Sequence, residues 1–365
     1  MEIGSVLELE QWEAYAVSDK GEKFYLPFMG KDTSYESVFY QSGRNAIESL
    51  LLFLKEKRKV KQVLIPDYMC ETVKDAAIRA GFLPEYYKID QSYDFIPEEI
   101  EEKLSPDTCL FVAHYFGKKM DRNLLAGIMS WKEQGIIVIE DVTLSLFSSD
   151  EQNGVGFGNY TLGSIRKWLP VPDGGFIASR SDALPVQIEG NCVSRYTDFY
   201  YMVQAMKKEY IQGGCKDTEL KKIYMDYYAL SIKELFSDYT LYPMSDWTGN
   251  YLKNYDRQQV IERRCNNYDY LYQGLSELSF LKVAVKREEG YLPFGMVVLV
   301  ENRDELLKYL IENDVYCNVH WRLEASSDNP ELTYLSQHSI TIPCDQRYGL
   351  EEMEYILDTI KRWKK

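Results

Sequence analysis

Lys167 is the side chain with the most direct chemical potential in this sequence. Its amine could form a Schiff base with a carbonyl carbon, because an uncharged lysine is a nucleophile and a nearby cation favours the uncharged form. Ser164 and Arg166 come just before it, and an apolar stretch with the tight turn Asp173-Gly174-Gly175 follows. The alternative is an ordinary solvated lysine, since most lysines lie at protein surfaces.

Three other segments carry polar groups that could bind a charged ligand. Residues 42–46 (SGRNA) open an expected helix, whose free amides and glycine would suit a phosphate. Asp141 ends an apolar strand, where ligands of doubly wound sheets bind, and could pair with a positively charged ring nitrogen. His114 lies at the end of another expected strand and could contact a cofactor ring or a substrate. The alternatives are an ordinary helix cap, a solvated acid and a histidine that satisfies core hydrogen bonds.

The elements that must position these residues show a regular alternation. From residue 43 to about 180, short apolar runs alternate with amphipathic segments, which is typical of a parallel sheet with crossover helices. Strands are expected at residues 62–66, 108–114 and 136–140, and helices at 44–57, 69–80 and 124–134.

The second half of the chain changes in character. Residues 198–240 are rich in tyrosine and lysine with helical periodicity, and the amphipathic stretch 255–278 leads into a strand and helix series at 291–363. This series predicts a separate α/β lobe. We therefore expect a large domain at residues 1–250 and a smaller domain at residues 251–365.

Composition narrows the class of protein. The 365 residues are 45% hydrophobic, and 57 acidic against 42 basic side chains give a net charge of −15. That charge repels nucleic acid and anionic membrane surfaces. The first residues lack the pattern of a secretory signal and no apolar run reaches transmembrane length, so we expect a cytoplasmic protein. Seven scattered cysteines without a CxxC pair and three histidines without an HExxH spacing predict no disulfide framework and no catalytic metal.

Seven short motifs resemble those of the DegT/DnrJ/StrS family of sugar aminotransferases, which depend on pyridoxal 5'-phosphate (PLP). The strongest is a lysine followed seven and eight positions later by two glycines, here Lys167, Gly174 and Gly175. The resemblance covers most of residues 40–345 through SGRNAI, IPDYMCETV, AGFLPEYYKID, VAHYFGKKMD, VIEDVT, GSIRKWLPVPDGG and RRCNNYDYL. It implies the PLP-dependent transferase fold type I, an α/β fold with a mostly parallel central sheet between helices and a smaller C-terminal α/β domain. Residues 1–35 are expected to pack on that smaller domain.

The resemblance also implies roles for individual residues. Lys167 would form the internal aldimine and later shuttle a proton, and Asp141 would pair with the pyridine nitrogen of the cofactor. Ser164 and the amides around Gly43 and Arg44 would hold the cofactor phosphate. His114 would contact the cofactor.

Several positions depart from the family pattern. Leu162 stands where the family usually has its phosphate-binding serine, and Leu144 replaces a glutamine that contacts the ring hydroxyl. Cys70 occupies the usual place of a stacking aromatic residue, for which Tyr68 is a possible substitute. Arg44 replaces a small residue and adds a charge near the phosphate. In the C-terminal lobe, His320 and Arg322 are candidate substrate contacts, with a solvated surface strand as the alternative.

The leading interpretation is a cytoplasmic, homodimeric PLP-dependent aminotransferase. It would transfer an amino group from an amino acid to a keto sugar, nucleotide-linked, in a pathway that builds surface polysaccharide or a glycosylated metabolite. One alternative is a PLP-dependent lyase or dehydratase of the same fold, although the sugar dehydratases of this family replace the lysine. The other alternative is a binding or sensing protein that kept the fold without turnover.

Overall fold

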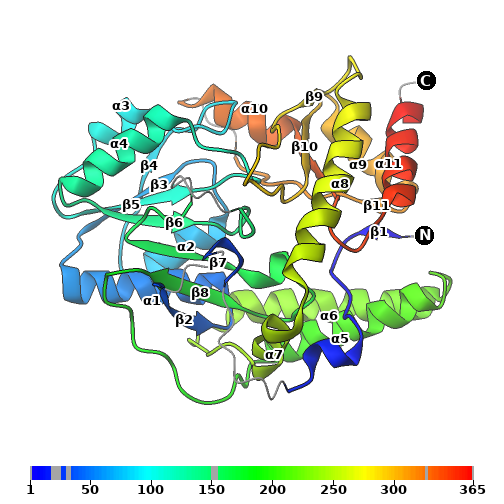
Figure 1. Ribbon diagram of the computed structural model, residues 1–365, viewed down its shortest axis with the longest axis horizontal. Coiled ribbons are helices and arrows are strands. Elements are labelled where there is room, and N and C mark those ends of the chain that lie inside the picture. The colour runs from blue at the N-terminus through cyan, green and yellow to red at the C-terminus, as the bar shows by residue number, and fades with distance from the viewer. Residues whose placement is uncertain (1, 18–25, 30–33, 149–154, 325–327, 364–365) are drawn as a thin grey trace.

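A seven-stranded sheet forms the centre of the larger part of the molecule. The computed structural model describes residues 2–17, 26–29, 34–148, 155–324 and 328–363 (Figure 1). The strand order is β2-β8-β7-β6-β5-β3-β4, parallel from β7 to β4, with β8 antiparallel to both β7 and β2. The strands are β2 (Glu36–Tyr40), β3 (Gln62–Pro66), β4 (Glu85–Tyr87), β5 (Thr108–Ala113), β6 (Ile137–Asp141), β7 (Tyr160–Ser164) and β8 (Gly175–Ser179).

Helices cover both faces of this sheet because its central strands are apolar on both sides. In β6, Ile137 and Ile139 pack in the cluster that contains α1 and α2, whereas Val138 packs in the cluster that contains α3 and α4. The helices are α1 (Gly43–Phe53), α2 (Glu71–Arg79), α3 (Pro97–Glu101) and α4 (Arg122–Glu133).

The predicted α/β fold with a mostly parallel central sheet is confirmed. The three predicted strands correspond to β3, β5 and β6. The three predicted helices correspond to α1, α2 and α4, with the π-helical turn Leu54–Arg58 extending α1. Both types of element follow from the spacing of apolar residues, which is a local property of the sequence.

Two long helices pack against each other beyond the central sheet. Figure 1 shows α5 (Arg195–Gln212) and α6 (Thr218–Ser237) side by side, as the periodicity of residues 198–240 predicts. The next helices are α7 (Asp246–Asn254) and α8 (Arg257–Leu275), which meet close to the boundary predicted at residue 250. The division into two domains stays a prediction. No helix in the described ranges is long and apolar enough to cross a membrane.

A smaller three-stranded antiparallel sheet lies among the elements from α8 to α11, residues 257–363, which are called the C-terminal lobe below. Its order is β12-β10-β9, and helices α8, α9 and α11 pack around it in one apolar cluster. The N-terminal strand β1 (Ile3–Gly4) pairs in parallel with β11 (Val315–Tyr316). The other elements are β9 (Lys282–Val283), β10 (Met296–Leu299), α9 (Arg303–Glu312), α10 (Pro330–His338), β12 (Ser339–Ile342) and α11 (Leu350–Trp363).

The turn at Gly174-Gly175, where β8 begins, packs against the residues that connect β2 to α1. Gly174 has a left-handed backbone with φ of +112° and donates its N–H to the Gln41 carbonyl oxygen at 2.8 Å. A Cβ on Gly175 would lie 2.1 Å from the carbonyl oxygen of Ser42. The glycine pair therefore lets β8 approach the start of α1 closely.

We expect Gly175→Ala to destabilise the protein, because backbone atoms of Ser42 occupy the place of the new methyl group. The free energy of unfolding should fall by about 2 kcal/mol or more. Denaturant unfolding checks this, with Gly127→Ala in α4 as the control, since a Cβ there meets only the Trp131 ring at 3.9 Å. Equal stability of the two variants would contradict the close approach of Gly175 to the Ser42 backbone.

Candidate active site

A cavity opens where the carboxyl ends of β5, β6 and β7 meet the start of α1. The strand register aligns Asp141 with Ala113 on one side and Leu162 on the other. Side chains that follow these positions therefore reach the same edge of the sheet. Seven of the ten predicted site residues line the cavity: Gly43, Arg44, Cys70, His114, Asp141, Ser164 and Lys167.

Lys167 ends a short 3-10 turn, Ile165–Lys167, that continues directly from β7. Its amine forms no hydrogen bond or ion pair with any residue that the structure describes. Burial lowers the pKa of Lys167, and the neighbouring Arg166 guanidinium acts in the same direction. The arrangement therefore favours an uncharged, nucleophilic amine.

Asp141 supplies a buried carboxylate to the same cavity. Its Oδ1 accepts a hydrogen bond from the Thr143 amide at 2.7 Å, which fixes the side chain at the end of β6. Burial raises the pKa of Asp141, whereas the Thr143 contact and the charge of Lys167 favour its ionised form. A cation in the cavity would stabilise the carboxylate further.

The start of α1 provides donors for an anion. Ser42 caps the helix, with its Oγ accepting from the Asn45 amide at 3.2 Å. Arg44 donates from Nη2 to the Asp238 carbonyl oxygen at 2.9 Å, but its buried Nε has no partner in the described ranges. The Ser164 hydroxyl makes no capping bond to its own turn and lines the same cavity. These groups suit a phosphate.

Ser164 reaches the cavity although Leu162 replaces the usual family serine. Side chains two positions apart on a strand point to the same face, so Leu162 and Ser164 share a direction. Leu162 packs in the core beside α1, and Ser164 lies at the open end of β7.

His114 lines the cavity, but its ring binds the Glu140 side chain. Its Nε2 lies 2.7 Å from Oε1 of Glu140, and both side chains are buried. Glu140 also accepts from the amides of Gly156 and Gly158 at 2.9 and 2.7 Å. Adjacent residues of β6 therefore face opposite ways, with Asp141 at the cavity and Glu140 in a structural network.

The structure does not bring Tyr68, His320 and Arg322 into this cavity. Tyr68 is fully buried and its hydroxyl donates to the His320 carbonyl oxygen. His320 faces a neighbouring cavity, where its Nδ1 lies 3.0 Å from Thr341 Oγ1 and burial lowers its pKa to about 3. Arg322 forms an exposed ion pair with Asp304 at 2.8 Å. Their roles in binding stay predictions.

Sequence reasoning missed several lining residues, among them Tyr115, Thr143 and Trp321. Trp321 comes from the C-terminal lobe and is the aromatic ring of the motif NVHWR, next to the two residues chosen there. Tyr115 directly follows His114. For Tyr115 and Trp321 the signal was an aromatic side chain beside a predicted contact, and for Thr143 it was a hydroxyl two residues after Asp141.

Solved structures of low sequence identity share this fold. DesV from S. venezuelae, in complex with a ketimine intermediate, is 14% identical, with 90% of this chain and 84% of that chain covered and a TM-score of 0.62. The sugar aminotransferase CalS13 from Micromonospora echinospora is 16% identical, with coverages of 89% and 87% and a TM-score of 0.60. NtdA from Bacillus subtilis, with bound cofactor PMP, is 16% identical, with coverages of 90% and 73% and a TM-score of 0.61. A search of curated protein sequences gives no match.

The fold is that of the fold type I PLP-dependent aminotransferases. The model of the DegT/DnrJ/EryC1/StrS aminotransferase family matches residues 3–201, which is more than half of the chain. The chain therefore belongs to this family and is a PLP-dependent aminotransferase.

The residues present fit PLP. The orphaned Nε of Arg44 and the start of α1 offer donors for a phosphate, Asp141 offers a carboxylate for a pyridinium nitrogen, and Lys167 offers an amine without a partner in the described chain. Leu144 lines the cavity in place of the family glutamine and brings no polar group.

We expect uptake of PLP by the apoenzyme to accelerate as the pH rises, with a midpoint below that of an ordinary lysine. The uncharged amine is the reactive form, and burial lowers the pKa of Lys167. Stopped-flow absorbance between about pH 6 and 11 measures the rate, with Nα-acetyl-lysine and PLP in the same buffers as the reference. A midpoint at or above the reference would contradict the predicted shift.

Proposed function

We propose that this chain transfers an amino group from an amino acid to a keto sugar, using PLP held between Lys167 and Asp141. The observation that carries the proposal is the lysine amine without a partner in the described chain. It shares one cavity with a buried carboxylate and with the phosphate-type donors at the start of α1. The half-buried Lys167 amine has no partner among the described residues, and its place at this cavity supports a chemical role.

Each residue has a separate task in this proposal. Arg44, Ser164 and the first amides of α1 bind the phosphate and orient the cofactor. Asp141 holds the proton on the ring nitrogen, because a buried carboxylate favours a cation beside it. PLP supplies an electron sink for the reaction. Lys167 would remove the proton from the carbon of the amino donor in one half-reaction and deliver a proton to the carbon of the keto sugar in the other.

The substrate and the biological setting belong to the same proposal. Membership in the family and the fold shared with the sugar aminotransferase CalS13 support a keto sugar as the amino acceptor. We further propose that the sugar is nucleotide-linked and that the enzyme is a cytoplasmic homodimer serving polysaccharide or glycosylated metabolite synthesis. Exposed apolar side chains on α5 and α6, among them Met202, Met225 and Phe236, are consistent with a subunit contact.

Lys167→Ala should abolish covalent attachment of PLP and lower the rate of transamination by about 100- to 10,000-fold, because the amine and proton carrier are removed. The visible absorbance band of the holoenzyme and a coupled assay with L-glutamate measure the two effects. Lys61→Ala is the control, since Lys61 forms an exposed ion pair with Asp107.

The same spectra distinguish the alternatives. An amino donor that converts the wild-type enzyme to its PMP form supports transamination. Release of water or ammonia without an amino donor would favour a lyase or dehydratase. A yellow protein whose spectrum no amino donor changes would favour a binding protein.

Asp141→Asn should keep the fold and bound PLP but lower kcat by about 100-fold or more, because the amide no longer stabilises a protonated ring nitrogen. The KM of the amino donor should change less than kcat. Steady-state kinetics check this against Asp107→Asn, a carboxylate change at the exposed pair with Lys61. A kcat equal to that of the control would remove Asp141 from the proposed role.

A further inference from the structure

A second cavity adjoins the first at Arg166 and Lys167. Arg166 and Lys167 line both cavities, so the two are neighbours across this pair of residues. The N-terminal segment Gly4–Leu7 and the C-terminal lobe form much of its wall. A ligand in this cavity would therefore have access to the reactive lysine.

The second cavity carries an excess of positive charge in a protein whose net charge is −15. Three arginines, Arg166, Arg264 and Arg347, line it with one acid, Asp345, and the Lys167 amine lies beside them. Such a concentration of charge attracts an anionic ligand.

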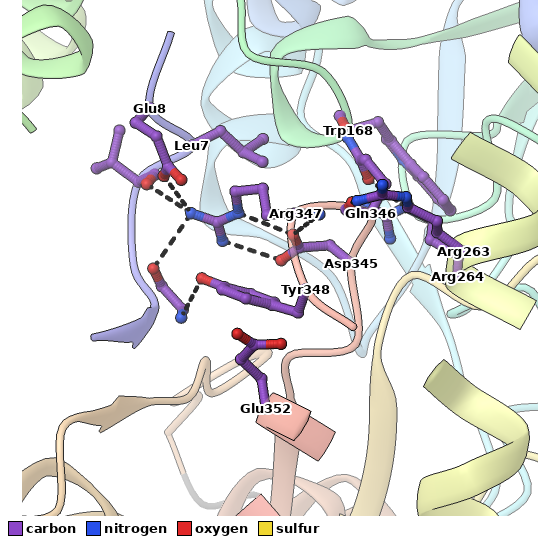
Figure 2. Close-up of polar contacts among 12 residues, drawn as sticks. Leu7, Glu8, Trp168, Arg263, Arg264, Asp345, Gln346, Arg347, Tyr348 and Glu352 are labelled. Carbon is purple, nitrogen blue, oxygen red and sulfur yellow. Dashed lines mark hydrogen bonds and ion pairs between the residues drawn. The ribbon is translucent and has the colours of Figure 1, made fainter. Parts of the chain in front are cut away.

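The positive charge of Arg347 is already balanced by two acidic side chains of the protein, Asp345 and Glu8 (Figure 2). Its Nε and Nη2 donate to the two oxygens of Asp345 at 2.8 and 2.9 Å, and its Nη1 donates to Glu8 at 2.9 Å. Nη1 also donates to the Val6 carbonyl oxygen at 2.9 Å, so Arg347 holds the N-terminal segment against the lobe. We assign it a structural role.

The positive charge of Arg264 is not balanced by an acidic side chain in this way among the described residues. Its side chain is 1% exposed, and Nε and Nη1 donate to the neutral oxygens of Gln346 and Phe294 at 2.7 and 2.9 Å. Its Nη2 has no hydrogen-bond partner, and no carboxylate forms an ion pair with it, within the residues that the structure describes. Asp345 acts on it through its charge, but Arg347 occupies both carboxylate oxygens.

The guanidinium of Arg264 is held in a fixed place. It lies 4.4 Å from the ring of Trp168, the residue that follows Lys167, and Gln346 links it to the Trp168 carbonyl oxygen through a 2.7 Å hydrogen bond (Figure 2). A buried charge without an acidic partner costs free energy unless a ligand supplies one. A fixed fork of N–H donors suits carboxylate or phosphate oxygens.

Arg166 is the second uncompensated guanidinium of this cavity. It lies over the rings of Tyr196 and Tyr200 at 5.7 and 5.1 Å and has no carboxylate partner in the described ranges. Its contacts with aromatic faces place the charge without cancelling it.

We propose that Arg264, together with Arg166, forms an anion subsite that binds a carboxylate or phosphate group of the substrate in the second cavity. The inference rests on the proposed function, because it takes this cavity as the place where substrates meet Lys167. A carboxylate would come from the amino donor or from an acidic sugar, and a phosphate from a nucleotide-linked sugar.

Two simple anions, succinate and inorganic pyrophosphate, test the subsite on the holoenzyme without turnover. Calorimetric titration of wild type and Arg264→Gln should show a loss of affinity of about 10- to 100-fold for at least one of them. A selective loss for succinate identifies a carboxylate site, and a selective loss for pyrophosphate identifies a phosphate site. Arg264→Lys, which keeps the charge and the stem beside Trp168, should recover part of the affinity.

Arg263→Gln is the matched control, because it removes one charge from the next position of α8 while Arg263 is exposed and lies outside this cavity. Its anion affinities should equal those of wild type. Unchanged affinity in both Arg264 variants, or no binding of either anion by wild type, would overturn the subsite. Wild type that binds an anion but shows no spectral change with any amino donor would instead contradict the proposed function alone.

Discussion

The parallel pairing of β5, β6 and β7 is the constraint on which the candidate site depends. Their register places Ala113, Asp141 and Leu162 side by side at one edge of the sheet. Lys167 follows β7 after one short turn, so its distance from Asp141 is set by the backbone. The turn at Gly174-Gly175 then brings the start of α1 to the same edge, which adds the anion donors.

The distribution of charge separates residues that hold the fold from residues available to ligands. Lys207 is fully buried, but it donates to the carbonyl oxygens of Gly4 and Val6 at 2.9 and 2.7 Å and lies near Glu2 and Glu8. These contacts offset the free-energy cost of burying the Lys207 charge. Among the described residues Lys167 has no such partner and Arg264 has no acidic one, and both line cavities. An ionisable group that has no balancing partner and lines a cavity indicates a ligand site.

The sequence predicted those features that depend on local patterns. Apolar spacing located β3, β5, β6 and the helices between them, and the end of an apolar strand located Asp141, whereas Lys167 was found through its neighbours and the Gly174-Gly175 motif. Contacts between the lobes could not be predicted in this way. The ion pair of Arg322 with Asp304 and the contact of Tyr68 with the His320 carbonyl oxygen depend on how the C-terminal lobe packs, which no local spacing encodes.

Packing between the lobes also decides how the candidate cavity is covered. Trp321 lines the cavity from the C-terminal lobe, and its ring lies 5.4 Å from that of Tyr68, which lies between β3 and α2. The Tyr68 hydroxyl fixes the peptide just before Trp321 by binding the His320 carbonyl oxygen. Tyr68 thus acts on the cavity through Trp321 and not by facing it. Because Cys70 takes the usual place of an aromatic residue, the aromatic cover that Trp321 adds depends on the contact between the lobes.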